Sequence, residues 1–192
     1  LDGISQWLQY WYYAQLRNGI RQPVEFMPRD ASGGGADGKP VDVDQTRLRL
    51  QDIASHSSGI WFVDTDSARY DSHHDAERLL ASTWDRVLAK DFVGERLKYF
   101  SMANPGPLAA DSATLDGLAL VQSTRLNHPV SPGQPLPVTL VWRSAGAPPP
   151  GFKESLRLVD KSGKIVAQQD ADLLGGFADS WQPNAANADH LG

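Results

Sequence analysis

Residues 136–170 constrain the fold most strongly, because apolar and polar side chains alternate there between closely spaced turns. Side chains on an extended strand point to its two faces in turn, so this pattern predicts strands with one apolar face. The apolar positions that share a face are Val138, Leu140 and Trp142 in one strand and Phe152, Leu156 and Leu158 in the next. Asp160–Gly163 has the composition of a hairpin turn, and further turn-rich segments recur at 127–135, 144–151 and 175–184. Short alternating strands at this spacing predict a β-sandwich.

The first 103 residues follow a different pattern, in which apolar residues at helical spacing are interrupted by short extended runs. Strands that alternate with helices predict a small three-layer α/β domain of Rossmann-like or flavodoxin-like type, here without its first strand. We expect its central strand to be buried on both faces, because that segment is apolar almost throughout. The predicted elements are helices at 4–17, 44–57 and from 71 or 72 to 88, strands at 23–28, 60–66 and 95–102, and an exposed, mobile loop at 29–42.

A boundary between two domains is predicted at residues 104–114, which contain two prolines and a glycine among small residues. This composition is typical of a linker. The α/β domain then covers residues 1–103, and residues 115–192 form an immunoglobulin-like β-sandwich. The sandwich is expected to be incomplete at its C-terminus, as the α/β domain is at its N-terminus, so we expect the chain to be a piece of a longer protein.

Composition excludes several classes of function. The 18 basic and 23 acidic residues give a net charge of −5, which is unsuited to binding a phosphate backbone, so no nucleic-acid partner is expected. No apolar run approaches the roughly 20 residues that span a bilayer. The chain has no cysteine and therefore neither disulfides nor thiolate metal sites. It also lacks the glycine patterns that bind dinucleotides or ATP, and no cofactor is expected.

Two acids and one tryptophan are candidate ligand contacts. Asp64 and Asp66 stand at the end of the predicted strand at 60–66, where α/β domains place ligand-binding groups. A carboxylate at this position could hold a ribose hydroxyl or a divalent cation, or it could cap a helix or form a turn. Trp181 lies in a turn-rich segment, where its ring is either a platform for a sugar or part of the core.

Other polar clusters predict neither a metal site nor catalysis. His73 and His74 are adjacent, so on a helix they point about 100° apart and cannot easily share one ion. Asp71 and Asp75 have a suitable spacing but need further ligands, and added Zn²⁺ or Ca²⁺ is expected to leave the melting temperature unchanged. The segment 56–58, His-Ser-Ser, lacks the G-x-S-x-G turn of a hydrolase nucleophile, and no catalytic residue is expected.

The aromatic residues of the first predicted helix allow two interpretations. Such rings combine an apolar face with a polar rim, so they could stack on sugars or lie at a membrane surface. They could equally pack against the sheet. These residues are Trp7, Tyr10, Trp11, Tyr12 and Tyr13.

Several segments of the chain form a pattern that is met in one known group of proteins. They are LQYWYYAQLRNG at 8–19, PVEFMP at 23–28, SGIWFVDTD at 58–66, HHDAERLL at 73–80, RVLAKDFVGERLKYF at 86–100 and, most telling, the stretch from PGQPLPVTLVW to DKSGKIVAQQD at 132–170 followed by GGFADSWQP at 175–183. Together they resemble the soluble C-terminal region of bacterial polytopic membrane glycosyltransferases of the dolichyl-phosphate-mannose protein mannosyltransferase-like group. The resemblance covers nearly the whole chain.

The resemblance implies a non-catalytic, extracytoplasmic accessory region, because the catalytic acids of that group lie in the membrane portion. Its implied partners are the membrane-embedded part of the same protein and a glycan or polyprenyl-phosphate sugar. Two alternatives stay open: a carbohydrate-binding module, and a free-standing α/β enzyme with an attached sandwich.

Overall fold

The computed structural model describes residues 27–31, 39–65, 71–93, 95–101, 106–126, 131–133 and 136–191. The helix expected at 4–17 with its aromatic set, the strand residues 23–26 and Asp66 lie outside the described residues. Within the described ranges the chain is mixed α/β and mostly strands, with a seven-stranded mixed sheet of order β1-β3-β2-β9-β6-β5-β4 and a two-stranded hairpin, β7-β8. It forms two compact units, one made of residues 1–80 and 88–100 and the other of 81–87 and 101–192.

Helix α2 spans Val43–His56 and confirms the helix expected at 44–57. Its N-cap is Asp42, whose side chain accepts a hydrogen bond from the Gln45 amide at 2.9 Å. Thr46 is fully buried, and its hydroxyl donates to the Asp42 carbonyl and accepts from the Arg29 amide. Thr46 thereby joins the helix to the segment before it, and the ends of the expected loop at 29–42 meet in a bridge between Asp30 and Val41.

Strand β1, Gly59–Thr65, follows α2 as predicted, but it is not buried on both faces. The side chain of Trp61 is 58% exposed, although its ring centroid lies 4.7 Å from that of Tyr99 on β3, Glu95–Ser101. The other face carries Phe62, which meets the fully buried Phe100 edge to face. Residues 60–63 are therefore all apolar for two reasons. Phe62 faces the core, and Trp61 contacts Tyr99 at the surface.

The helix expected to reach Leu88 is wrong beyond residue 81. Helix α4 spans only Asp75–Ala81, and residues Asp85–Phe92 form strand β2. Ser82 and Thr83 follow the helix, and such side chains compete with the helix for backbone hydrogen bonds. Strands β2 and β3 are neighbours joined by two residues, a connection too short for a parallel crossover. The alternation of helix and strand expected for residues 1–103 is therefore interrupted by a hairpin.

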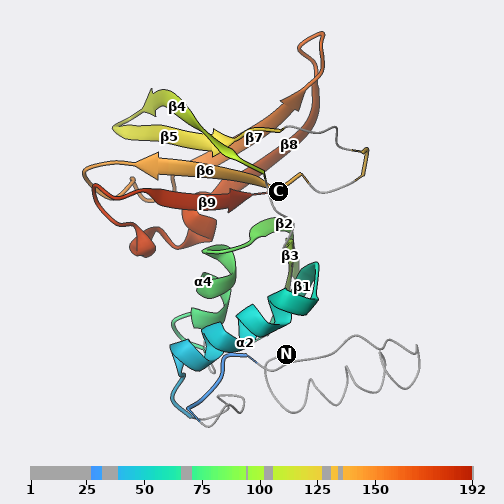
Figure 1. Ribbon diagram of the computed structural model, residues 1–192, viewed down its shortest axis with the longest axis vertical. Helices are drawn as coiled ribbons and strands as arrows, with labels where there is room; N and C mark the ends of the chain where they lie inside the picture. The colour runs from blue at the N-terminus through green and yellow to red at the C-terminus, as the bar shows by residue number, and fades with distance from the viewer. Residues whose placement is uncertain are drawn as a thin grey trace. The chain divides into compact units, whose positions relative to one another are not determined.

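The second unit is built from four antiparallel strands and a separate hairpin (Figure 1). The four strands are β4 (Leu108–Leu115), β5 (Leu118–Thr124), β6 (Val138–Arg143) and β9 (Asn187–Leu191), and the hairpin consists of β7 (Lys153–Val159) and β8 (Ile165–Asp172). Leu140 and Leu191 from the four strands pack against Ala171 and Leu156 from the hairpin. The strands expected at 138–142 and 152–160 are thus confirmed, but Leu158, which was expected to share the apolar face of Phe152 and Leu156, is 48% exposed.

The sequence did not predict two strands of this unit, β4 and β9. β4 begins at Leu108, so most of the expected linker at 104–114 corresponds to a strand paired with β5. Asp116 and Gly117 join them with φ values of 48° and 83°, the conformation of a tight hairpin turn. β9 pairs antiparallel with β6 along its length and parallel with β2 at Leu191 and Arg86.

The second unit also contains two short 3₁₀ helices, Leu173–Gly176 and Ala178–Ser180, between β8 and β9. They carry Leu173 into a small core with Leu118 and Trp181. Within the described residues, neither α-helix has the length and apolar character needed to cross a bilayer.

Candidate functional site

Three side chains of the first unit that are typical metal ligands lie close together. They are Asp64 near the end of β1, His74 just before α4 and Glu77 in the first turn of α4. One carboxylate oxygen from each acid and one ring nitrogen of His74 all lie within 4.8 Å of one another. Asp64 was a candidate from the sequence. His74 and Glu77 lie close enough to it that all three side chains could contact the same bound ion.

The turn before α4 fixes the position of His74. The carboxylate of Asp71 accepts hydrogen bonds from the amides of Asp75 and Ala76, at 2.8 and 3.1 Å. The His74 amide donates to the Asp71 carbonyl, and His74 adopts φ 55°, a left-handed conformation that histidine tolerates better than most residues. Burial raises the pKa of Asp71, although these two amide hydrogen bonds lower it in part. Asp71 therefore serves as the cap of the turn and does not join the cluster.

Glu77 has a buried partner on β3. Its carboxylate forms an ion pair with Lys98 Nζ, and both side chains are almost completely buried. A buried ion pair is stable only when its geometry is good, and here it joins the first turn of α4 to the sheet. The contact is made through one oxygen, Oε1, of the Glu77 carboxylate and so fixes the position of this side chain.

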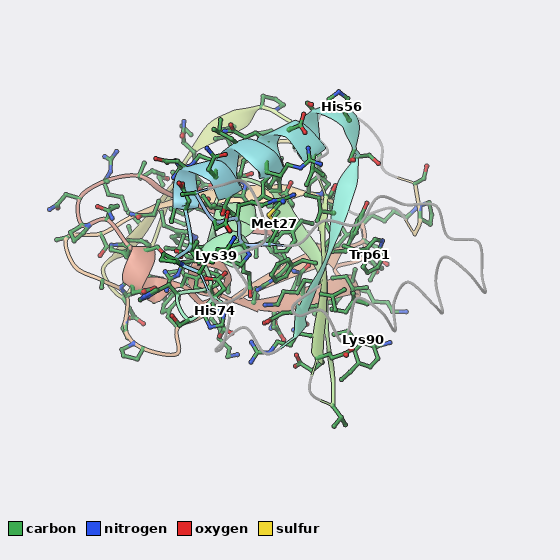
Figure 2. All side chains as sticks on the ribbon, turned by 90° about the horizontal axis from the view of Figure 1, so that it is seen from below. Met27, Lys39, His56, Trp61, His74 and Lys90 are labelled. Atoms are coloured by element: carbon green, nitrogen blue, oxygen red, sulfur yellow. The ribbon has the colours of Figure 1, made fainter. Side chains whose placement is uncertain are left out.

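The other histidines and serines considered from the sequence do not join this cluster. His73 is exposed, and its carbonyl accepts a hydrogen bond from Arg78 Nε. His56 lies at the end of α2, and Figure 2 shows it well apart from His74. The hydroxyl next to its ring, at 2.7 Å, belongs to Ser55 and not to Ser57 or Ser58. The geometry brings together His74 and Asp64, whereas the other histidine of the 73–74 pair faces solvent.

Trp181 is 5% exposed and packs with Leu118 and Leu173, next to the partly buried Trp142. A sugar platform needs an open aromatic face. Burial of this ring therefore favours the interpretation of Trp181 as a core residue.

A second cluster of buried acids lies in the second unit. Glu154 on β7 and Asp189 on β9 are 6% and 2% exposed, and burial together with the charge of Asp189 raises the pKa of Glu154 to about 8. Burial also raises the pKa of Asp189, although its carboxylate accepts a hydrogen bond from the Leu174 amide at 2.6 Å. The Nε1–H of Trp142 lies near Glu154 without full hydrogen-bond geometry. Two buried carboxyl groups this close together repel each other when both are charged, so at neutral pH one of them keeps its proton.

Sequence reasoning missed Glu77, Lys98 and Glu154. Glu77 follows His74 by three residues, the spacing at which two ligands share one helix face, and this signal was available in the sequence. Lys98 and Glu154 gave no such signal, because a charged residue inside a strand normally faces solvent. No family model, curated protein or solved structure matches the chain significantly.

Proposed function

We propose that this chain is a non-catalytic, extracytoplasmic accessory region of a membrane glycosyltransferase that uses a lipid-linked sugar donor. Its role in this proposal is to dock on the membrane-embedded part of the same protein and to help position the acceptor or glycan. The resemblance of the sequence to the C-terminal region of such enzymes supports the proposal. A feature of the second unit, the β7-β8 hairpin, supports it independently.

The outer half of the β7-β8 hairpin exposes apolar residues on both of its faces. Near the core, the inner face carries Glu154 and Leu156, which are turned toward the four-stranded part of the sheet. Beyond Leu156 the two strands continue as an unsupported ribbon, which extends past the ends of the other strands in Figure 1. Four aliphatic side chains there are 45 to 55% exposed, namely Leu158, Val159, Ile165 and Val166.

These aliphatic residues are accompanied by basic ones. Lys161 and Lys164 lie in the exposed turn of the ribbon, and Arg157 lies on β7. A two-stranded ribbon in water gains little from burial, so four exposed aliphatic residues on it are best explained by contact with a partner. Basic residues beside an apolar patch suit a position at a membrane surface with anionic lipids. The ribbon therefore supplies a docking element for a membrane-embedded partner.

We also propose a fold type for each of the two units. We propose that the second unit is an immunoglobulin-like β-sandwich, supported by the packing of Leu140 and Leu191 against Ala171 of the hairpin. We propose that the first unit is a Rossmann-like or flavodoxin-like α/β domain, and the order α2-β1-α4 supports this.

The docking role can be tested in the full-length protein in its membrane. Val159 and Ile165 are cross-strand partners at the exposed end of the ribbon, so replacing both with threonine removes apolar contact but keeps a residue type that favours strands. We expect sugar transfer from the lipid-linked donor to fall about tenfold while membrane insertion stays normal. In the isolated chain the same double substitution should leave the melting temperature nearly unchanged, because both side chains are exposed.

Ser155 and Asp170 provide the matched control, since they are also exposed cross-strand partners on this hairpin. Replacing both with threonine should reduce transfer much less than the Val159/Ile165 change. Unchanged transfer in the Val159/Ile165 variant would contradict the docking role of the ribbon. Transfer catalysed by the isolated chain, and abolished by Asp64→Asn, would contradict the non-catalytic assignment.

A further inference from the structure

The charges around Asp64 do not cancel among the described residues. Asp64, Glu77 and Lys98 are 7%, 4% and 7% exposed. Lys98 neutralises Glu77 through their ion pair. Within the part of the chain that the structure describes, no hydrogen bond or ion pair joins the Asp64 carboxylate to another side chain. A cation beside a carboxylate that is so little exposed to water stabilises its charged form.

We propose that Asp64, His74 and Glu77 bind a divalent transition-metal ion of the zinc class. The three donor atoms come from β1, from the turn before α4 and from α4 itself, and they converge within 4.8 Å. Two ligand atoms of one tetrahedral zinc ion lie about 3.4 Å apart, given metal–ligand bonds of about 2.0 to 2.2 Å. Side-chain movements on the order of 1 Å are therefore enough to enclose an ion.

The donor types select the metal. Ca²⁺ and Mg²⁺ prefer oxygen ligands, whereas an imidazole together with carboxylates suits Zn²⁺ and its neighbours in the first transition row. Three protein ligands leave at least one coordination position for water or for an oxygen of a bound ligand. This inference is independent of the proposed docking role, because it concerns the first unit, whereas the ribbon belongs to the second.

Lys98 acts as a positioning residue in this site. It contacts one oxygen, Oε1, of the Glu77 carboxylate and so fixes the position of this ligand. Partners of this kind orient the ligands of a metal and affect its affinity. Removal of Glu77 would leave Lys98 buried without its counter-ion, so Glu77 is a poor position for a first test.

The test is a titration of the isolated chain, freed of metal with EDTA, with ZnCl₂ at neutral pH by calorimetry, together with thermal melts. We expect saturable binding of one ion per chain and a rise in melting temperature that depends on zinc concentration. Mn²⁺ should bind more weakly than Zn²⁺, and Ca²⁺ and Mg²⁺ more weakly still. Asp64→Asn should weaken zinc binding about tenfold or more, while unfolding in EDTA shows that this variant folds.

Histidine variants provide a matched pair. His74→Asn retains a residue that accepts the left-handed backbone and should weaken zinc binding as strongly as Asp64→Asn. His73→Asn changes the exposed neighbour and should leave binding unchanged. The site is ruled out by the absence of saturable binding, by a preference for Ca²⁺ or Mg²⁺, or by equal losses in the two histidine variants, which would indicate adventitious binding at surface histidines.

Discussion

At the scale of single residues, the most unusual group is the carboxyl of Glu154, which is buried opposite another acid. Glu154 and Asp189 come from different strands, and Asp85 adds a third buried carboxylate whose neighbour is His190 at 3.6 Å. The amide of Leu174 and the charge of Arg86 favour the ionised form of Asp189. Glu154 lacks comparable partners among the described residues, so it is the acid that keeps its proton.

This protonation predicts a loss of stability as pH rises. In the folded protein the pKa of Glu154 is about 8, against an ordinary value of 4.5. Between these values the folded state holds a proton that the unfolded chain has released, so the free energy of unfolding decreases as pH increases through this window. We expect urea melts to show a loss on the order of 1 to 3 kcal/mol between pH 5 and pH 8.5.

The variant Glu154→Gln isolates this effect. Glutamine stays neutral and similar in size, so its stability profile between pH 5 and pH 8.5 should be flatter than that of the unmodified chain. Glu95→Gln is the control, because Glu95 is exposed, and its profile should follow that of the unmodified chain. A steep profile that survives in Glu154→Gln would assign the pH dependence to another group.

At the scale of elements, the sequence predicts strands and turns best where side-chain alternation and turn chemistry agree. The hairpin turn at Asp160–Gly163 is an example. The Asp160 carboxylate accepts hydrogen bonds from the Ser162 amide, the Ser162 hydroxyl and the Lys164 amide, and these contacts lower the pKa of Asp160. Gly163 adopts φ 82°, as expected for the left-handed position of the turn.

Gly163→Ala should therefore destabilise the hairpin by about 1 to 2 kcal/mol, the cost of a left-handed conformation for a residue with a Cβ atom. No atom lies within 4 Å of the added methyl group, so the loss measures backbone strain alone. Gly146→Ala is the control, since its surroundings are equally open and its φ is not positive. Denaturant melts should show a loss for Gly163→Ala and none for Gly146→Ala. Equal effects would contradict the turn assignment.

The elements that could not be predicted are those in which local signals compete. After α4 the apolar residues Trp84, Val87 and Leu88 continue the helical spacing, yet β2 forms because pairing within the sheet outweighs this weak preference. The Asp116–Gly117 dipeptide is a strong hairpin signal, but the prolines and small residues before it indicate a linker. Of the candidate site, Asp64 was predictable from its place near the end of a strand. Glu77 became its neighbour only through the tertiary packing of α4.

At the scale of the whole molecule, the boundary between the two units does not follow the order of the chain. Residues 81–87 belong to the second unit, although residues 88–100 return to the first. Arg86 Nη1 donates to the Gly175 carbonyl, and Gln169 donates to the Arg86 carbonyl, each at 3.3 Å. Asp85 faces His190, and Arg86 pairs with Leu191 of β9. Residues 81–87, which are distant from β9 in the sequence, thus cover the edge of β9.

This arrangement predicts that the second unit loses stability when residues 81–87 are cut away from it. A fragment of residues 101–192 lacks residues 81–87, so β9 becomes an open edge and the half-buried His190 loses Asp85. A fragment of residues 81–192 keeps these contacts and carries residues 88–100 as a connection. We expect the shorter fragment to unfold at a lower urea concentration, with a difference in the free energy of unfolding on the order of 2 to 4 kcal/mol, comparable to the loss of several buried contacts.

A synthetic peptide of residues 81–93 separates this cause from a general effect of chain length. Added to the fragment 101–192, it should raise the melting temperature in a saturable way, because it binds the folded form at the edge of β9. The same peptide with Asp85→Asn and Arg86→Ala should stabilise the fragment much less, since it loses the contacts with His190 and Gly175. Equal stability of the two fragments would show that residues 81–87 are dispensable. In that case the second unit folds from residue 101 onward, and its edge at β9 is stable without a neighbour.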